Sequence, residues 1–347
     1  MSKASPVDRR ATELSEWVAT TLGDDDFALA PASADASFRR YFRATLRRDH
    51  VLAQGARTLI VMDAPPPRED CRPFVRVASL LADAGVHAPV VHAEDLERGY
   101  LLLSDLGTTT YLQALAEPAA NADALFADAL DALVSWQLAT RPDVLPPYDD
   151  ALLRRELELF PEWYIGRHLG ATLTATERAS LATIFDRIIA TNLAQPQVFV
   201  HRDYMPRNLM RSMPNPGVLD FQDAVFGPIT YDVASLFKDA FVSWPEERVL
   251  DWTIRYWERA RHAGLPVDRD FGSFWRAVEW MGLQRHLKVL GIFARICHRD
   301  GKAGYVEDTP RFLDYVRPVA ARYGELAPLA RLLDRLERTP VAAGAAS

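Results

Sequence analysis

The sequence predicts an α+β fold of two lobes: a small N-terminal lobe with an antiparallel sheet and one main helix, and a larger, mostly helical C-terminal lobe. Three observations lead to this prediction. Most strand-like segments fall in the first 104 residues, helical periodicity dominates after Thr108, and a run from Val200 to Asp232 with two conspicuous acidic residues interrupts the helical part. We therefore divide the chain into an N-lobe of residues 1–104, a C-lobe of residues 105–340 and a disordered tail of residues 341–347.

Composition and charge exclude several classes of protein. Of the 347 residues, 49% are hydrophobic, which is ordinary for a globular chain, and the formal net charge is −7. We expect no nucleic-acid partner, because nucleic-acid binding relies on a basic surface. The N-terminus is charged where a signal peptide would be apolar, and no apolar run has membrane-spanning length. We expect a cytoplasmic monomer with no membrane partner.

The first predicted element is a helix that starts near Ser5, a good N-cap residue, and stops at Gly23. Its apolar face consists of Leu14, Trp17, Val18 and Leu22. Residues 35–44 then alternate like a strand, with Phe38, Arg40 and Phe42 on one face and Arg39, Tyr41 and Arg43 on the other. This pattern predicts a hairpin with its turn at residues 33–37.

The rest of the N-lobe is predicted as three strands and its main helix. A strand covers Thr58–Asp63, and the helix covers Glu69–Ala84 before Gly85 stops it. The inward face of this helix consists of Phe74, Val77, Ala78 and Leu81. Two further strands, Val90–His92 and Tyr100–Leu103, flank a polar turn.

The C-lobe is predicted as helices with two short strands between them. The helices cover Asn121–Ala139, Leu152–Arg167 and Thr176–Leu193, and the strands are Gln197–Val200 and Val218–Leu219. A further helix begins at Val233, and the remaining chain is helical and rich in tryptophan. Polar residues that follow short buried strands are well placed to act in a site.

The residues that follow the two short strands are those that phosphoryl transfer needs. His201, Arg202, Asp203 and Asn208 form the pattern H-R-D-x-x-x-x-N, and Asp220 follows Val218–Leu219. Transfer of a phosphoryl group to a hydroxyl requires a carboxylate near the attacking oxygen and oxygen ligands that hold Mg²⁺ on the nucleotide phosphates. Asp203 suits the first role, and Asn208 and Asp220 suit the second, so ATP and Mg²⁺ are the expected cofactors.

This run resembles the aminoglycoside phosphotransferase and choline kinase family, whose fold is similar to that of protein kinases. The residues that carry the resemblance are V-H-R-D-Y-M-P-R-N-L-M from Val200 and G-V-L-D-F-Q-D-A from Gly217. Within the family, they look like the bacterial anomeric kinases that act on N-acetylmuramate and N-acetylglucosamine in peptidoglycan recycling. The resemblance implies a bilobal protein-kinase-like fold and phosphorylation of the C1 hydroxyl of these amino sugars.

The resemblance also implies where the nucleotide binds. Ser37, in the hairpin turn, is expected near the phosphates, and Ser104, Asp105 and Leu106 form the linker that meets adenine. The family's strand lysine is absent, because Met62 stands at about that position. Arg40 and Arg43 are the expected substitutes, and Glu69 is a candidate partner for one of them.

The acceptor is expected to be a small molecule. A protein kinase has an activation segment that ends in A-P-E after its D-F-G motif. Here a G-P-x-x-Y turn leads directly into a helix instead. Asp232, which follows this turn, is expected to brace the catalytic loop. Candidate substrate-binding residues are Arg207, Asp223, Gln284, Arg285 and Lys288. The basic residues Arg207, Arg285, His286 and Lys288 favour a neutral or anionic sugar over a polycationic antibiotic.

Two alternative functions stay open at this stage. One is a kinase for a different small alcohol, namely an aminoglycoside, choline or homoserine. The other is a catalytically dead nucleotide-binding module, which the missing lysine and the glycine-poor turn suggest. The presence of Asp203, Asn208 and Asp220 argues against the second alternative.

Overall fold

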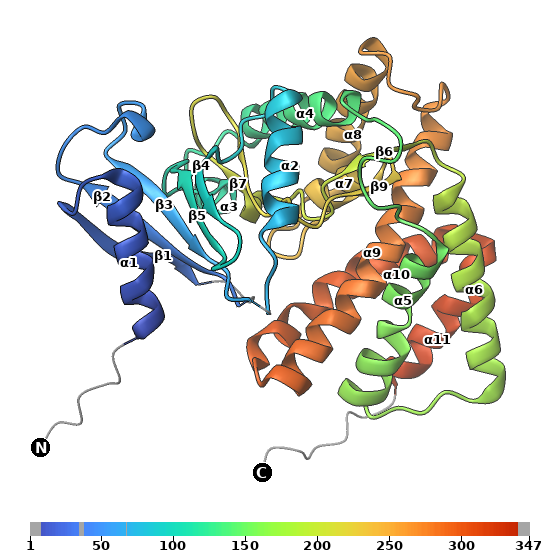
Figure 1. Cartoon of the computed structure of the whole chain (residues 1–347). Coiled ribbons are helices and arrows are strands. Elements are labelled where there is room, and N and C mark those ends of the chain that lie inside the picture. The colour runs from blue at the N-terminus through green and yellow to red at the C-terminus, as the bar shows by residue number, and fades with distance from the viewer. Residues whose placement is uncertain (1–7, 35–37, 67, 339–347) are drawn as a thin grey trace, which may run out of the picture. The chain divides into compact units, whose positions relative to one another are not determined.

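The computed structural model describes residues 8–34, 38–66 and 68–338. The chain forms two compact units, which are coloured along the sequence in Figure 1. The N-terminal unit comprises residues 1–109 and 210–223, and the C-terminal unit comprises residues 110–209 and 224–347. The segment that carries Asp220 therefore packs with the N-terminal unit, although it follows the catalytic loop in sequence. The predicted tail, residues 341–347, lies outside the described residues.

The N-terminal unit is built on a five-stranded antiparallel sheet, as the sequence predicts. Its strands, in spatial order, are β1 (Phe27–Ala34), β2 (Arg40–Leu46), β3 (Thr58–Asp63), β5 (Tyr100–Ser104) and β4 (Val91–Asp95). Strands β1 and β2 form the predicted hairpin, but β2 begins at Arg40 rather than at residue 35. Residues 35–37, including the predicted phosphate-site residue Ser37, lie outside the described residues.

Helix α1 (Arg9–Leu22) covers one face of this sheet. Its predicted apolar face packs against the strand residues Leu59, Val61 and Leu102. The helix is capped by Asp8, whose side chain accepts the N–H of Ala11, and not by Ser5, which lies outside the described residues. The helix ends at Gly23, as predicted. This glycine has φ +63°, the left-handed conformation that is common at the C-terminal end of a helix.

Helix α2 (Arg72–Asp83) lies on the opposite side of the sheet from α1 (Figure 1). Its predicted inward residues are all buried, and the ring of Phe74 contacts that of Phe221 in a tilted arrangement with centroids 4.6 Å apart. The helix starts at Arg72, after the predicted start at Glu69, and a proline stands in its first turn.

The C-terminal unit is mostly helical, as predicted. Its helices are α3 (Tyr111–Leu115), α4 (Ala122–Leu138), α5 (Asp150–Leu157), α6 (Ala175–Leu193), α7 (Tyr231–Phe237), α8 (Glu246–His262), α9 (Phe271–Asp300), α10 (Thr309–Arg322) and α11 (Ala327–Glu337). Strand β6 (Gln197–Val200) pairs antiparallel with β9 (Val225–Pro228). The short strands β7 (Leu209–Met210) and β8 (Gly217–Val218) pair with each other, and β8 belongs to the N-terminal unit.

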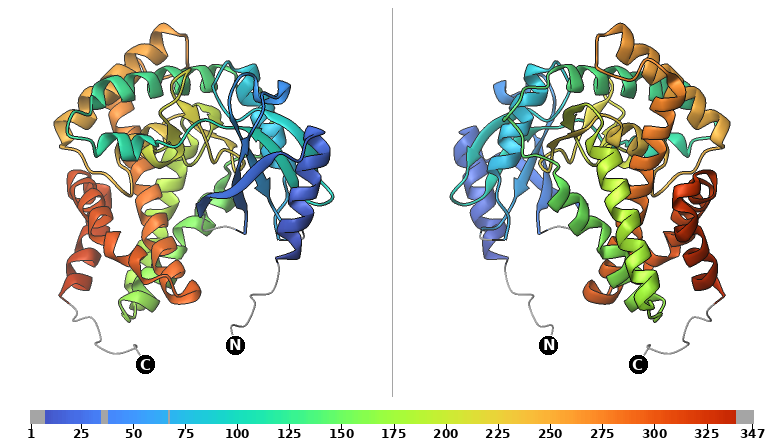
Figure 2. Two further views of the ribbon diagram at one scale, coloured as in Figure 1. Left: turned by 90° about the vertical axis from the view of Figure 1, so that its left-hand side faces the viewer. Right: turned by 90° about the vertical axis from the view of Figure 1, so that its right-hand side faces the viewer.

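Helix α9 forms the centre of the C-terminal unit, and Figure 2 shows it flanked by α6 and α10. One predicted helix differs from the structure beside it. The expected helix Leu152–Arg167 ends at Leu157 as α5, and Phe160–His168 forms a π-helix instead. At this crossing Gly291 of α9 lies against the backbone of Leu159, closer than a side chain on residue 291 would permit.

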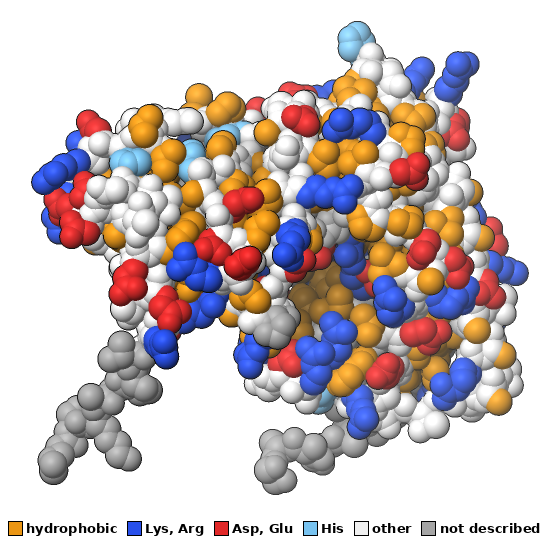
Figure 3. Space-filling view, in the orientation of Figure 1, with side chains coloured by type: hydrophobic (Ala, Val, Ile, Leu, Met, Phe, Trp, Pro, Cys, Tyr) orange, Lys and Arg blue, Asp and Glu red, His pale blue; other side chains and the backbone are white. Residues whose placement is uncertain are grey.

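The surface has mixed charge. On the face drawn in Figure 3, Lys and Arg side chains are interspersed with Asp and Glu rather than gathered in one basic patch. Within residues 8–34, 38–66 and 68–338, no helix combines the length and the apolar character needed to cross a membrane.

Candidate active site

The catalytic loop follows the buried strand β6 in the C-terminal unit. Asp232, at the start of α7, accepts the backbone N–H of His201 at 2.7 Å through Oδ2 and that of Arg202 at 3.0 Å through Oδ1. Both carboxylate oxygens of Asp232 thus hold the two residues that precede Asp203. Asp232 therefore braces the loop, as the sequence predicts.

Asp232 is fully buried, and burial raises the pKa of its carboxyl to about 7. The backbone N–H groups of His201 and Arg202 and the positive charge of Arg285 oppose this rise, while the negative charge of Asp203 adds to it. The pKa of the Asp232 carboxyl therefore depends on the charges of Asp203 and Arg285 as well as on burial.

Arg202 is held from two directions. Its backbone has φ +76°, a left-handed conformation that is uncommon for a residue with a side chain and is often found at functional sites. Its guanidinium donates to Glu156 Oε1 at 2.5 Å. Because Arg202 immediately precedes Asp203, these contacts fix the direction in which the chain enters the candidate catalytic residue.

Glu156 is the centre of a buried polar cluster that the sequence analysis missed. Besides Arg202, it accepts Lys288 Nζ at 3.0 Å, Gln284 Nε2 at 3.1 Å and the hydroxyl of Tyr148. Burial alone would raise the pKa of Glu156, but Lys288 and Arg202 hold it down at about 2. No local sequence signal marks Glu156, since three of its four partners come from two distant segments, the catalytic loop and α9.

This low pKa makes a testable contribution to stability. A carboxyl whose pKa is lowered on folding stabilises the protein above its unfolded value, 4.5, and loses that contribution as the pH falls towards 2. Glu156→Gln is expected to lower the free energy of unfolding by about 3 kcal/mol at pH 7. At pH 4 the deficit should be about 1 kcal/mol smaller, because the wild type has then begun to lose the contribution.

Urea denaturation of both proteins at the two pH values measures this difference. Glu258→Gln, which changes an exposed residue of α8, is the control and should stay within about 0.5 kcal/mol of the wild type. A deficit of equal size at both pH values would contradict the assigned ionisation of Glu156.

Asn208, which we predict to bind Mg²⁺, makes a hydrogen bond within the catalytic loop. Its Nδ2 donates to the main-chain carbonyl of Asp203 at 2.9 Å, which directs Oδ1 away from that carbonyl. Amide and carboxylate oxygens are ligands that Mg²⁺ accepts. Among the described residues there is no group of three or more His, Cys, Asp or Glu that could hold a metal ion, but a Mg²⁺ that also binds phosphates needs only one or two protein carboxylates.

Asp220 lies in the N-terminal unit, shortly after β8. Its backbone has φ +63°, a second uncommon left-handed conformation, and its Oδ1 accepts Gln222 Nε2 at 2.9 Å. In the sequence, Asn208 immediately precedes β7 and Asp220 follows β8, and the connection of a few residues between these two strands is that of a hairpin.

The predicted nucleotide residues that are described all lie in the N-terminal unit. Arg43 Nε donates to Asp105 Oδ2 at 2.6 Å, and the side chain of Ser104 accepts the N–H of Val90 at 2.9 Å. Leu106 is buried, and its main-chain N–H has no hydrogen-bond partner within the described part of the chain.

Arg40 and Glu69 do not pair with each other or with Arg43. Arg40 donates to Asp63 Oδ2 at 2.9 Å through Nε and also pairs with Asp8. Glu69 pairs instead with Arg39, at 3.1 Å, so the expectation that its partner would be Arg40 or Arg43 is wrong.

The predicted acceptor residues have different surroundings. Arg207 is exposed in the catalytic loop, with its guanidinium 5.4 Å from the ring centre of Phe241, and Asp223 is exposed in the N-terminal unit. The three predicted residues of α9, Gln284, Arg285 and Lys288, are buried. Gln284 and Lys288 hold Glu156, and the positive charge of Arg285 acts on the carboxyl of Asp232.

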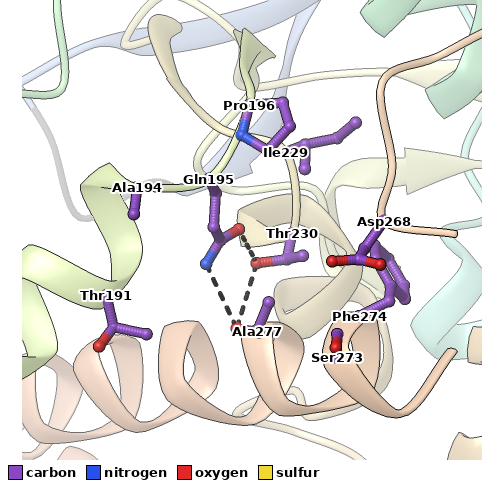
Figure 4. A pocket seen from close by; sticks show the side chains of 10 residues that line it. All are labelled: Thr191, Ala194, Gln195, Pro196, Ile229, Thr230, Asp268, Ser273, Phe274 and Ala277. Atoms are coloured by element: carbon purple, nitrogen blue, oxygen red, sulfur yellow. Dashed lines mark hydrogen bonds between the residues drawn. The ribbon is translucent and has the colours of Figure 1, made fainter. Parts of the chain in front are cut away.

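A separate cavity of about 160 Å³ lies at the other end of β6, beside Pro196. Figure 4 shows Gln195 and Thr230 pointing towards the carbonyl of Ala277 in this cavity. Thr230 Oγ1 donates to Gln195 Oε1 at 2.6 Å, and Gln195 Nε2 donates to the Ala277 carbonyl at 3.4 Å. Since the strand separates this cavity from His201, we do not assign it to phosphoryl transfer.

The kinase-like fold and the H-R-D loop define a phosphotransferase. Residues 28–275 match the phosphotransferase enzyme family, and the chain belongs to that family. Among solved structures, a choline kinase from Streptococcus pneumoniae has a TM-score of 0.62 at 14% identity, with 90% of this chain and 99% of that one covered. The ADP-bound aminoglycoside phosphotransferase APH(2'')-Ib has a TM-score of 0.55 at 15% identity, with 89% and 98% covered. At such identities the likeness shows the fold.

More similar relatives are N-acetylmuramate/N-acetylglucosamine kinases. The one from Pseudomonas putida is 55% identical over 95% of this chain and 97% of its own length. The one from Pseudomonas aeruginosa is 60% identical over 89% of this chain and 88% of its own length. The Neisseria meningitidis relative is 48% identical over 94% and 96%.

Proposed function

We propose that this protein uses ATP to phosphorylate the C1 hydroxyl of N-acetylmuramate and N-acetylglucosamine. The observation that carries the proposal is the catalytic loop, in which Asp232 and Glu156 hold the backbone and side chain that precede Asp203. The amino-sugar kinases that are 48–60% identical to this chain supply the substrate class. The predicted compartment is the cytoplasm, and the monomeric state also stays a prediction.

In this mechanism Asp203 accepts a hydrogen bond from the anomeric hydroxyl and takes its proton as the oxygen attacks phosphorus. Asn208 and Asp220 would hold Mg²⁺ through their side-chain oxygens, and the ion would supply positive charge to the nucleotide phosphates. Ser104, Asp105 and Leu106 form the linker that would receive adenine, and the N–H of Leu106 is suited to donate to it.

The alternatives make different predictions with a panel of acceptors. The protein is incubated with Mg-ATP and N-acetylmuramate, N-acetylglucosamine, kanamycin or choline, and the products are followed by phosphorus NMR. A phosphate on C1 of an amino sugar supports the proposal. Phosphorylation of only kanamycin or choline would favour the kinase of another alcohol, and no ADP with any acceptor would favour the dead module.

Arg207 is proposed to bind the lactyl carboxylate that distinguishes N-acetylmuramate from N-acetylglucosamine. It is exposed four residues after Asp203, and within the described residues no carboxylate pairs with it. A hydrogen bond to a charged group contributes about 1.5–3 kcal/mol. Arg207→Gln is therefore expected to raise KM for N-acetylmuramate by about tenfold or more.

N-acetylglucosamine is the internal control for this variant, because it lacks the lactyl group. Steady-state kinetics of Arg207→Gln should give an unchanged KM for N-acetylglucosamine. An equal rise in KM for both sugars would show that Arg207 does not bind the lactyl carboxylate.

A further inference from the structure

The N-terminal unit has no lysine on β3 to grip the nucleotide phosphates. The expected position holds Met62, which is buried. Three arginines at or beside the neighbouring strand β2 could supply the missing charge: Arg39, Arg40 and Arg43. The register of the sheet and the ion pairs within this unit distinguish between them.

Arg40 lies on the face of the sheet opposite to Met62. In the β2–β3 pair, Tyr41 is opposite Met62 and Arg40 is opposite Asp63. Opposed residues share a face and successive residues alternate, so Arg40 and Asp63 lie on the α1 side. The ion pairs of Arg40 with Asp63 and Asp8, the N-cap of α1, keep its charge on that side.

Arg43 shares the face of Met62 by alternation, but it lies further from the hairpin turn, opposite Ile60. Its guanidinium is bound at three points: Asp105 accepts at 2.6 Å and 3.1 Å, and the carbonyl of Gly107 accepts at 2.9 Å. Arg43 is therefore tied to the segment that follows β5, at a position away from the hairpin turn.

Arg39 stands at the turn end of the hairpin, immediately before β2. Its Nε donates to Glu69 Oε2 at 3.1 Å, and Glu69 Oε1 accepts the backbone N–H of Phe38 at 3.2 Å. One carboxylate from the segment before α2 thus fixes both the side chain of Arg39 and the backbone beside it. The side chains of Arg39 and Glu69 are only 14% and 15% exposed, so water screens this pair weakly.

We propose that Arg39, oriented by Glu69, binds the α- and β-phosphates of ATP in place of the lysine that β3 lacks. This rests on the proposed function as an ATP-dependent kinase. In protein kinases the phosphate-binding lysine is likewise held by a glutamate of the N-lobe helix. A guanidinium can replace an ammonium in this role, because its planar fork donates two hydrogen bonds to phosphate oxygens.

The test compares Arg39→Met with Arg10→Met. Arg10 is a matched control, since it is a partly buried arginine of the same unit that pairs with Asp63, at 2.7 Å, on the α1 side. Calorimetric titration with Mg-ADP and the KM for ATP are measured for each. Arg39→Met is expected to weaken Mg-ADP binding and to raise KM for ATP by about tenfold or more, and Arg10→Met should leave both within about threefold.

Two further variants, Arg39→Lys and Glu69→Gln, complete the test. They also allow the proposal to be tested if Arg39→Met does not fold. The lysine variant keeps the charge and should bind Mg-ADP between the wild type and Arg39→Met, and Glu69→Gln should weaken binding by loosening the arginine. Unchanged Mg-ADP binding in these variants would overturn the proposal. A wild type that binds Mg-ADP but phosphorylates no amino sugar would instead refute the proposed substrate, leaving the role of Arg39 intact.

Discussion

Replacing Asp203 with asparagine is expected to lower kcat by about a thousandfold, within the range that positioned acid–base groups contribute. Asparagine keeps the size of the side chain but cannot take the proton of the attacking hydroxyl. The backbone contacts of Asp232 to His201 and Arg202 do not involve the Asp203 side chain, so the loop should keep its conformation. Single-turnover transfer from ATP to N-acetylmuramate measures the effect on chemistry directly.

Nucleotide binding separates a loss of chemistry from a loss of structure in this variant. Affinity for Mg-ADP, measured by calorimetry, should change less than threefold in Asp203→Asn. Asp314→Asn, on the exposed side of α10, is the control for the substitution itself and should keep wild-type turnover. If Asp203→Asn kept wild-type turnover, Asp203 would not be the group that accepts the proton of the attacking hydroxyl.

Replacing Gly291 with alanine is expected to reduce the free energy of unfolding by about 3 kcal/mol. A Cβ on residue 291 would lie 2.5 Å from both the carbonyl oxygen and the Cβ of Leu159, at the start of the π-helix. Backbone cannot move aside as the end of a flexible side chain can, so the crossing of α9 with this segment would have to open. Urea denaturation of the variant measures the loss.

Gly282, in the same helix, provides the matched control. A Cβ there would meet its nearest neighbour, Cε1 of His286, at 3.5 Å, which is ordinary contact. Gly282→Ala should be neutral or stabilising by up to about 1 kcal/mol, because alanine has the higher helix propensity. Equal changes at both glycines would mean that the Leu159 contact does not limit the packing of α9.

Elements with strong local patterns were predicted well from the sequence. The bounds of β3 and β6 agree with the predicted strands Thr58–Asp63 and Gln197–Val200, because each is a short apolar run next to polar residues. The catalytic loop was identifiable for a similar reason, since Asp203 and Asn208 have a fixed spacing within one short segment.

Features that depend on distant contacts could not be predicted. The π-helix Phe160–His168 lies at a crossing with Gly291, and nothing near residue 160 in the sequence reports that contact. Glu156 was missed because its partners are Arg202, Gln284 and Lys288. Gln284 and Lys288, which we predict to bind the acceptor, are buried and hold this carboxylate. Their part in acceptor binding stays a prediction.

The Glu156 cluster also constrains how this sequence can evolve. One buried negative charge is balanced against the two cations Arg202 and Lys288, and a buried charge that loses its partner is strongly destabilising. Loss of Lys288 alone leaves Arg202 to balance Glu156, whereas loss of Glu156 leaves two cations in the interior beside the loop. Substitutions at these three positions should therefore be accepted in a set order: one cation is lost first, and Glu156 and the remaining cation are then lost together.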